Sequence, residues 1–436
     1  MGTSNRGRWA TLMGGSIVML IIGTLYSWAI FTQPLLVLFH WNLTTTTLAF
    51  GIANFSLAAV GAVLGGFWQD QVGSRKVALA GVSLWGLGNL LAGLGTPTFG
   101  AWWLYATYGV IGGIGAGMAY IAPLALVSKW FPDKRGLAGG LVTGSFALGA
   151  FVYNQLIPRL SDFHAVAVHA AGIVATAAGS GGMPLAPGAA PAMAASETDA
   201  VMQVFITSGL AFLLVGLPAA WLFRDPPRDP RHTATAADVG YPPSKVLAMP
   251  QFYLLWLQLF ANAIAGLSII SNAVPLIADL TKLSPASIAP LFGTVSVFNA
   301  LGRFLWGGLS DRIGCNKTFA AMFAVQAVTL ALLSHAHGLT EALAGISIVL
   351  LCCGGGFGTM PSYNAQYFGT RYMGLNYGLV LSAWGFAGLI GPTLLARARD
   401  LSGSYAETLP TVAVALLVSV VLPFVTRKPV AARIGH

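Results

Sequence analysis

The chain has 436 residues, of which 56% are hydrophobic and 8% are charged, and its mean hydropathy is +0.74. Since soluble proteins carry about 25% charged residues, this composition excludes a soluble enzyme, a secreted domain and a disordered protein, and it leaves a helical membrane protein with several spans. The net charge of +9 does not indicate nucleic-acid binding, because the basic residues stand in short clusters between apolar stretches.

Twelve apolar stretches are long enough to cross a bilayer core of about 30 Å, which takes roughly 20 residues in a helix. The sequence therefore predicts an all-α membrane protein with twelve transmembrane helices. The first stretch is longer than the apolar region of a signal peptide, roughly 7–15 residues, so we expect it to be retained as a span. The predicted spans are residues 9–38, 45–68, 77–96, 101–128, 136–158, 201–223, 251–279, 286–309, 318–336, 340–366, 373–396 and 407–427.

The lysine and arginine residues predict how these spans are oriented. With the amino terminus placed in the cytoplasm, 17 of the 22 basic residues fall on the cytoplasmic side. Loops on that side of membrane proteins are enriched in Lys and Arg. We therefore expect both termini to be cytoplasmic.

Two segments between the spans differ in composition from the rest. Residues 163–200 are rich in Ala, Gly and Pro with almost no charge, which predicts a flexible outer insert. Residues 224–250 begin with a charged, proline-rich run and predict a cytoplasmic linker. The expected domains are an amino-terminal six-helix bundle at 1–223, which includes the insert, and a carboxyl-terminal six-helix bundle at 251–436.

An internal repeat relates the two predicted bundles. The run Gly66-Phe-Trp-Gln-Asp-Gln-Val-Gly-Ser-Arg-Lys76 recurs as Gly307-Gly-Leu-Ser-Asp-Arg-Ile-Gly-Cys-Asn-Lys317, at an offset of 241 residues. A second, shorter echo relates residues 136–140 to residues 374–378 at an offset of 238. Parallel six-span repeats are how many secondary transporters form a site near the middle of the membrane, between their halves.

The repeated loop resembles the signature of the major facilitator superfamily, whose fold consists of two pseudo-symmetric six-helix bundles. An aspartate at a helix end, followed by a glycine turn and two cations, can latch neighbouring helices on the inner side, and rearrangement of that latch permits rocking. The alternative is a tight basic turn that only orients the chain. The candidate gating residues are Asp70, Gly73, Arg75, Lys76, Asp311, Gly314 and Lys317.

Further motifs resemble the oxalate/formate antiporter family, which groups with the monocarboxylate transporters. They include Leu25-Tyr-Ser-Trp28 in the first span, Trp130-Phe-Pro-Asp-Lys-Arg-Gly-Leu-Ala-Gly139 after the fourth, and Gly302-Arg-Phe-Leu-Trp-Gly307 in the eighth. The resemblance covers nearly the whole chain except 163–200, and it implies a carboxylate transporter of the bacterial inner membrane. Also similar are Asn272-Ala-Val-Pro275, Pro361-Ser362 and Asn376-Tyr-Gly378.

Arg303 is the most informative residue because it lies within the eighth predicted span. Residues 295–309 are otherwise uncharged and mostly apolar, and an arginine at mid-membrane costs roughly 2.5–3.5 kcal/mol on insertion scales. Its planar guanidinium stays charged and can bind a carboxylate with two hydrogen bonds, and in the resembling families this arginine binds the substrate carboxylate. The alternative is extension toward the cytoplasmic interface near Asp311. Asn299, one helical turn before Arg303, can contact the substrate, position the guanidinium or simply pack against a neighbouring helix.

Four aromatic residues complete the candidate substrate site. Tyr26 and Tyr120 offer hydroxyl donors from the first and fourth spans. Phe357 and Trp384 are candidates for apolar walls, which would exclude water and strengthen an ion pair with the arginine. For each of the four, the alternative is ordinary packing between helices.

The sequence departs from its relatives at Trp384. Oxalate exchangers of the family carry a lysine there, six residues after the glycine of Asn-Tyr-Gly, and that lysine supplies a second cation for a dianion. A lone arginine balances one negative charge, so a monocarboxylate such as lactate or formate is favoured over oxalate. Animal proton-coupled monocarboxylate carriers have an aspartate where this chain has Asn299, which puts the proton pathway in doubt.

The sequence as a whole predicts a secondary active transporter that moves small carboxylates by alternating access, as an exchanger or a proton symporter. The alternatives are an oxalate/formate-type dicarboxylate antiporter, a drug or cation exporter, and a carboxylate-sensing receptor. No His, Asp or Glu cluster with catalytic or metal spacing lies in the spans, so we expect no enzyme, metal or cofactor. The expected partners are the carboxylate, the lipid bilayer and, for symport, protons, without nucleic acid. A monomer is expected.

Overall fold

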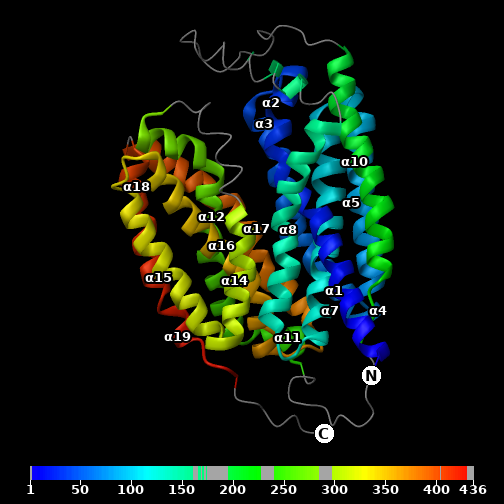
Figure 1. Cartoon of the computed structure of the whole chain (residues 1–436), viewed down its shortest axis with the longest axis vertical. Helices are drawn as coiled ribbons and strands as arrows, with labels where there is room; N and C mark the ends of the chain where they lie inside the picture. Colours follow the sequence, from blue (N-terminus) through cyan, green and yellow to red (C-terminus); the bar gives the residue numbers. More distant parts are fainter. Residues whose placement is uncertain are drawn as a thin grey trace.

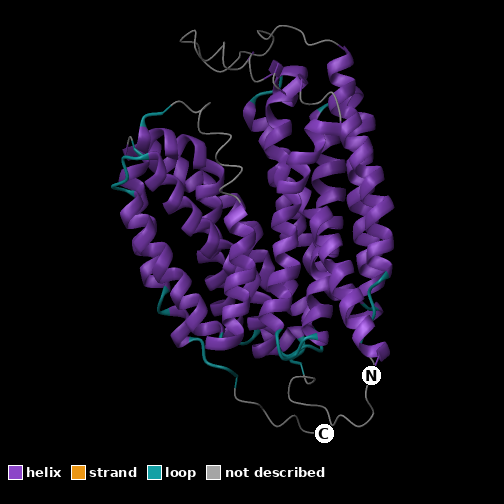
Figure 2. Cartoon of the chain, viewed as in Figure 1, coloured by secondary structure: helices purple, strands orange, loops and turns teal. Residues whose placement is uncertain are grey.

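The computed structural model describes residues 2–160, 165–167, 169–170, 173, 195–226, 240–283, 297–402 and 404–429. Most of the predicted outer insert at 163–200 and the centre of the predicted linker at 224–250 lie outside these residues. Within the described ranges the regular structure is helical and no strand occurs (Figures 1 and 2). This agrees with the all-α prediction.

The amino-terminal half contains long helices, several of which are interrupted by a tighter or wider turn. A 3₁₀ turn, η1, separates α1 from α2, and π turns, η2 and η3, stand within the second and fourth spans. The elements are α1 (Gly2–Gly23), η1 (Thr24–Trp28), α2 (Ala29–Leu38), α3 (Leu43–Phe55), η2 (Ser56–Gly61), α4 (Ala62–Val72), α5 (Ser74–Phe99), α6 (Ala101–Leu104), η3 (Tyr105–Gly112), α7 (Gly113–Trp130), α8 (Arg135–Leu160) and α10 (Ala195–Trp221).

The carboxyl-terminal half begins with a short helix that follows the undescribed part of the linker. Its elements are α11 (Pro243–Leu247), α12 (Pro250–Thr281), α14 (Val297–Ile313), α15 (Cys315–Leu333), α16 (Leu339–Phe368), α17 (Met373–Ser402), α18 (Tyr405–Ser419) and α19 (Leu422–Val425).

Eleven helical runs in the described residues are long and apolar enough to cross a membrane. They correspond to eleven of the twelve predicted spans. The remaining span, predicted at 286–309, is described only from residue 297 onward, where it forms α14. Its first half therefore lies outside the described residues.

The helices form two groups that meet along a central seam (Figure 1). Helices α12, α15, α16 and α18 lie in one group, and α1, α5, α7 and α10 lie in the other. At the seam, α8 packs against α14, and α4 packs against α17. We call the end with α11 and α19 the lower end and the opposite end the upper end. The two groups approach each other at the lower end and diverge toward the upper end (Figure 1).

Small residues allow α14 to lie in close contact with α8 on one side and with α16 on the other. A Cβ atom on Gly140 of α8 or on Gly358 of α16 would collide with the carbonyl oxygen of Arg303. A Cβ on Gly354 would likewise collide with the carbonyl oxygen of Asn299. Glycine at helix contacts lets two backbones approach closely. The backbone that carries Arg303 is therefore clamped between two neighbouring helices.

The other contact at the seam repeats this arrangement. Gly378 of α17 packs against the carbonyl oxygen of Ala62 in α4. The repeat offset of 241 relates Ala62 to Arg303, and the offset of 238 relates Gly378 to Gly140. The two glycine contacts are therefore built alike, with Arg303 at one position and Ala62 at the equivalent position of the other.

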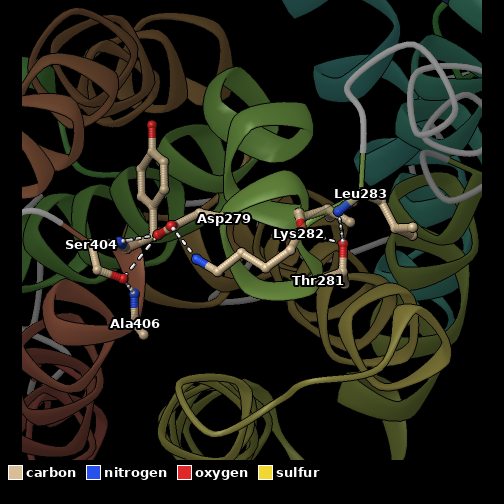
Figure 3. A network of polar contacts seen from close by, with 8 residues as sticks. Asp279, Thr281, Lys282, Leu283, Ser404 and Ala406 are labelled. Carbon is tan, nitrogen blue, oxygen red and sulfur yellow. Dashed lines mark hydrogen bonds and ion pairs between the residues drawn. The ribbon is translucent and has the colours of Figure 1, made fainter.

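A polar network at the upper end fastens α12 to α18 within the carboxyl-terminal half (Figure 3). The Asp279 carboxylate accepts hydrogen bonds from the Ser404 hydroxyl at 2.9 Å and from the backbone N–H of Tyr405 at 2.8 Å. The Lys282 ammonium lies 3.3 Å from the same carboxylate. Ser404 in turn caps α18 by accepting from the N–H of Ala406. These hydrogen bonds and this ion pair all lie within the carboxyl-terminal half.

The glycine contact at Arg303 predicts the outcome of a matched pair of substitutions on α8. Gly140→Ala should destabilise the protein by about 1–3 kcal/mol, because overpacking forces backbone to move. Gly144→Ala is the control, since the nearest atom to its added Cβ, the carbonyl oxygen of Ala300, lies 3.5 Å away. Melting temperatures of the purified proteins in detergent test this. Equal melting temperatures for the two variants would contradict the close contact.

Candidate functional site

Arg303 lies at the seam, near the middle of the bundle, and its side chain is almost completely buried at 1% exposure. Its Nε donates a hydrogen bond to Oδ1 of Asn299 at 3.3 Å, and its Nη1 donates to the carbonyl oxygen of Thr143 at 3.1 Å. Asn299 is held in turn by a bond from its Nδ2 to the carbonyl oxygen of Leu350. The guanidinium is therefore positioned by both halves of the protein.

Two phenylalanine rings flank the guanidinium. Its central carbon lies 4.8 Å from the ring centroid of Phe357 in α16 and 5.4 Å from that of Phe146 in α8. A cation over an aromatic face is stabilised by about 0.5–2 kcal/mol. This partial compensation does not neutralise the charge.

Trp384 of α17 closes the aromatic enclosure. Its ring centroid lies 5.2 Å from that of Phe357 and 5.8 Å from that of Phe146. Tyr26 of η1 and Tyr120 of α7 contact the same tryptophan, at 6.0 and 5.7 Å. Trp384 is buried, at 1% exposure. Together with Phe146, Phe357, Tyr26 and Tyr120 it forms a group of five aromatic rings, contributed by both halves, next to the guanidinium.

All six residues that the sequence singles out for the substrate site come together in this region. Arg303 and Asn299 both lie on α14. Phe357 contacts the guanidinium, and Trp384 lies next to that phenylalanine ring. Tyr26 and Tyr120 lie next to Trp384. The predicted alternative for Arg303, extension toward the interface, does not describe its buried position.

Sequence reasoning missed Phe146 and the carbonyl group of Thr143. A signal for Phe146 was present, because the repeat offset of 238 relates it to Trp384. The two rings thus occupy equivalent positions in the two halves and meet at the seam. Thr143 contributes its backbone carbonyl oxygen, and every residue type has that atom, so the sequence cannot indicate this contact.

The charge of Arg303 has no acidic partner among the described residues. The ion pairs found there join Arg8 to Asp133, His169 to Glu197 and Lys282 to Asp279. Nor does any group of three or more His, Cys, Asp or Glu in the described part of the chain form a candidate metal site. The site therefore presents one fixed positive charge.

A small cavity of about 50 Å³ lies between the halves, next to the aromatic enclosure. It is bounded by Phe50 and Asn54 of α3 and by Gly385, the neighbour of Trp384. The Phe50 ring also contacts that of Tyr26, at 6.3 Å. The complete lining is Phe50, Gly51, Asn54, Leu267, Gly385, Gly388 and Leu389.

The two repeated aspartates fasten the halves together at the lower end. Asp311, near the end of α14, accepts hydrogen bonds from the backbone N–H groups of Gly136 and Leu137, both at 2.8 Å. These N–H groups stand at the start of α8, where backbone donors are free and the helix dipole favours an anion.

Asp70, near the end of α4, makes the equivalent contact with the start of α17. It accepts from the N–H groups of Gly374 and Leu375 at 3.1 and 3.0 Å. In both copies a carboxylate from one half caps a helix of the other half.

The remaining candidate gating residues do not bridge the halves. Gly73 and Gly314 both have a φ of 88°, a conformation that side chains disfavour, and they allow the sharp turn that follows each aspartate. Arg75 donates from Nε to the carbonyl oxygen of Phe223 at 2.8 Å, within its own half. Lys76 and Lys317 are exposed. The lysines and arginine of the predicted latch are therefore peripheral to the contact made by the aspartates.

The sequence pattern of the Major Facilitator Superfamily matches residues 12–178 and 165–392 of this chain. The chain therefore belongs to that superfamily. It is a membrane protein with several spans and a transporter rather than an enzyme, and the predicted fold class is confirmed.

Three curated relatives show where the chain falls within the superfamily. It is 26% identical over 390 residues to the oxalate:formate antiporter of Oxalobacter formigenes, with 88% of this chain and 83% of the relative covered. It is 27% identical over 390 residues to apicoplast pyruvate carrier 1 of Toxoplasma gondii, with 77% and 67% covered. It is 22% identical over 451 residues to human monocarboxylate transporter 14, with 92% and 86% covered.

The fold is similar to that of the Escherichia coli fucose:proton symporter FucP. The TM-score is 0.67 at 14% identity, and the alignment covers 96% of this chain and 98% of the symporter chain. A crystal structure of the same transporter in the outward conformation aligns with a TM-score of 0.69.

The lower-end contacts predict how Asp311 affects conformation. Asp311→Asn removes the charge and one acceptor for two N–H groups, and hydrogen bonds to charged groups contribute about 1.5–3 kcal/mol each. The lower end should then open more often, by roughly tenfold in population. Spin labels at Lys134→Cys and Lys428→Cys, exposed positions in different halves, measure this as a longer distance.

Asp133→Asn is the matched control for that experiment. Its carboxylate pairs with Arg8 at 3.1 Å inside one half, and 58% of its side chain is exposed. The label distances should stay as in the native protein. A similar lengthening in both variants would contradict a specific role for Asp311.

Proposed function

We propose that this protein is a secondary transporter of small monocarboxylates, such as lactate or formate, and that Arg303 binds the carboxylate. The observation that carries the proposal is a buried guanidinium at the seam, with no acidic partner among the described residues. An arginine cannot lose its proton in the membrane, so it needs an anion or a compensating environment. A carboxylate fits, because its two oxygens match the guanidinium in a bidentate pair.

The number of cations at the site favours a monoanion over a dianion. Trp384 occupies the position where the resembling oxalate exchangers have a lysine, and it packs as an aromatic wall beside Phe357. A second carboxylate would have to leave water without a cation, and such a desolvated charge costs several kcal/mol. Oxalate/formate-type dicarboxylate exchange, as in the Oxalobacter relative, is the second candidate.

Transport would proceed by alternating access, with the two halves rocking about the seam. Among the described residues, the hydrogen bonds between the halves lie at the lower end and at Arg303. The structure thus corresponds to a state closed at the lower end. By the distribution of Lys and Arg, that end faces the cytoplasm of a bacterial inner membrane, so opening would require both aspartate contacts to break.

Exchange of one carboxylate for another should be easier than net flux. An empty carrier has to reorient with Arg303 unpaired in a closed site, whereas a bound carboxylate removes that cost. Proton symport would require a proton to travel with the substrate or to titrate a group at the cavity rim. Asn299, which holds the guanidinium, offers no titratable group for this purpose.

Two rival functions fit the site less well. An exporter of cationic drugs would need an embedded carboxylate to attract its substrate, but the centre of this site is a guanidinium enclosed by aromatic rings. A carboxylate-sensing receptor could share the site. It would bind the same acids without moving them, so an uptake measurement distinguishes it from a transporter.

One substitution at Arg303 distinguishes the contribution of its charge to transport from the contribution of its planar shape. Arg303→Lys keeps the charge but loses the bidentate geometry, so uptake of labelled lactate, pyruvate or formate into proteoliposomes should fall at least tenfold. Arg8→Lys, at a partly exposed surface ion pair, should transport normally. Undiminished uptake by Arg303→Lys would exclude the proposed role.

The exchange preference predicts a dependence on internal substrate. Proteoliposomes loaded with unlabelled acid should take up the labelled acid several-fold faster than empty ones, because the loaded carrier returns without an unpaired buried charge. Initial rates at equal external concentration and equal pH measure this. Identical rates in loaded and empty vesicles would show that the empty carrier reorients freely.

A further inference from the structure

Two buried tyrosine hydroxyls lie near Arg303 and make no hydrogen bond of regular geometry with the described residues. Tyr120 of α7 and Tyr377 of α17 both have 0% exposure. Neither hydroxyl makes a hydrogen bond of regular distance and angle to a described residue, although the Tyr120 hydroxyl lies near enough to the Tyr377 hydroxyl and to the Arg303 guanidinium for longer, weaker contacts. Leaving such a group unpaired in the interior costs about 1–3 kcal/mol.

The two hydroxyls belong to the same region as the guanidinium. They lie close enough to Arg303, and to each other, for an electrostatic interaction. The Tyr120 ring also contacts Trp384, at 5.7 Å. Tyr377 stands seven residues before Trp384, two helical turns along the same face of α17. One donor thus comes from each half of the protein.

The chemistry of these three groups specifies what they can bind together. A guanidinium has only donors, and a hydroxyl without a partner retains its donor. An ionised carboxylate has only acceptors, with about four lone-pair sites, so it can accept from all three at once. A wholly apolar ligand would leave the hydroxyls unpaired, and a cationic ligand would be repelled by the guanidinium.

We propose that Tyr377, together with Tyr120, donates a hydrogen bond to the substrate carboxylate that Arg303 binds, and that Tyr377 is a specificity-determining residue of the site. This inference rests on the proposed function. Because both hydroxyls are neutral, they add donors without adding charge. The site therefore strengthens its hold on a monoanion while giving no further stabilisation to a second negative charge.

Replacement of Tyr377 by phenylalanine separates a binding role from a structural one. Tyr377→Phe removes a hydroxyl that makes no regular hydrogen bond with the described residues, so the melting temperature without added ligand should stay nearly the same or rise. The same change should weaken the apparent affinity for the carboxylate about ten- to hundredfold. Structural damage would instead lower the melting temperature.

Tyr363→Phe is the matched control. Tyr363 of α16 is also completely buried, and its hydroxyl also has no hydrogen-bond partner among the described residues. Its ring contacts Phe319 and Tyr367, away from the aromatic enclosure. This variant should keep the native affinity.

The experiment uses the full chain in detergent and in proteoliposomes, with formate, lactate and pyruvate as probes. Acid-induced shifts in melting temperature report binding, and the concentration dependence of uptake reports affinity. The expected result is that Tyr377→Phe loses most of the acid-induced shift, while Tyr363→Phe keeps it.

The possible failures are distinguishable. If the native protein neither binds nor carries any of the acids, the proposed function is wrong, and the inference falls with it. If the native protein responds but Tyr377→Phe has an unchanged affinity, only the inference is overturned. A melting temperature that falls sharply in Tyr377→Phe, with an affinity loss matched by Tyr363→Phe, would also overturn it.

Discussion

The central constraint on this structure is the free-energy cost of burying one guanidinium. That group lies away from water, and among the described residues it has no acidic partner. Arg303 receives partial compensation from Asn299, from the carbonyl of Thr143 and from two aromatic rings. These contacts orient the group but leave its positive charge in place. Clamping of its backbone by Gly140 and Gly358 keeps the charge at the seam, where both halves can reach an anion bound to it.

The lower-end contacts and the central site act at different places along the same seam. Each aspartate caps the start of a helix in the opposite half, so the halves are joined by hydrogen bonds that can break as a unit. The upper-end network around Asp279 joins two helices of one half, which favours movement of that half as a rigid body. The proposed binding at Arg303 and the proposed movement of the halves would thus be linked through shared helices, since α8 and α14 contribute to both contacts.

Much of the fold was predictable from sequence, because twelve apolar stretches and a repeated loop leave few alternatives. Arg303 was predictable for a different reason: a charged residue within a membrane span is energetically costly, so it stands out in the sequence. The repeat offset also related Phe146 to Trp384, although a phenylalanine in an apolar helix attracts no attention by itself. The contact of Thr143 was not predictable, because a backbone carbonyl has no sequence signature. The unpaired state of the Tyr377 hydroxyl depends on the positions of all its neighbours, which only coordinates supply.

The relation of Arg303 to Ala62 makes the two halves unequal in charge. The two copies of the repeat share their helix contacts and their aspartate caps, yet one copy has a guanidinium where the other has a methyl group. A substitution at Ala62 would alter only the packing at the seam, whereas a substitution at Arg303 would also remove a buried charge. The pseudo-symmetry of the backbone is therefore not matched by a symmetry of charge, and the electric field of the guanidinium enters the seam from the carboxyl-terminal half.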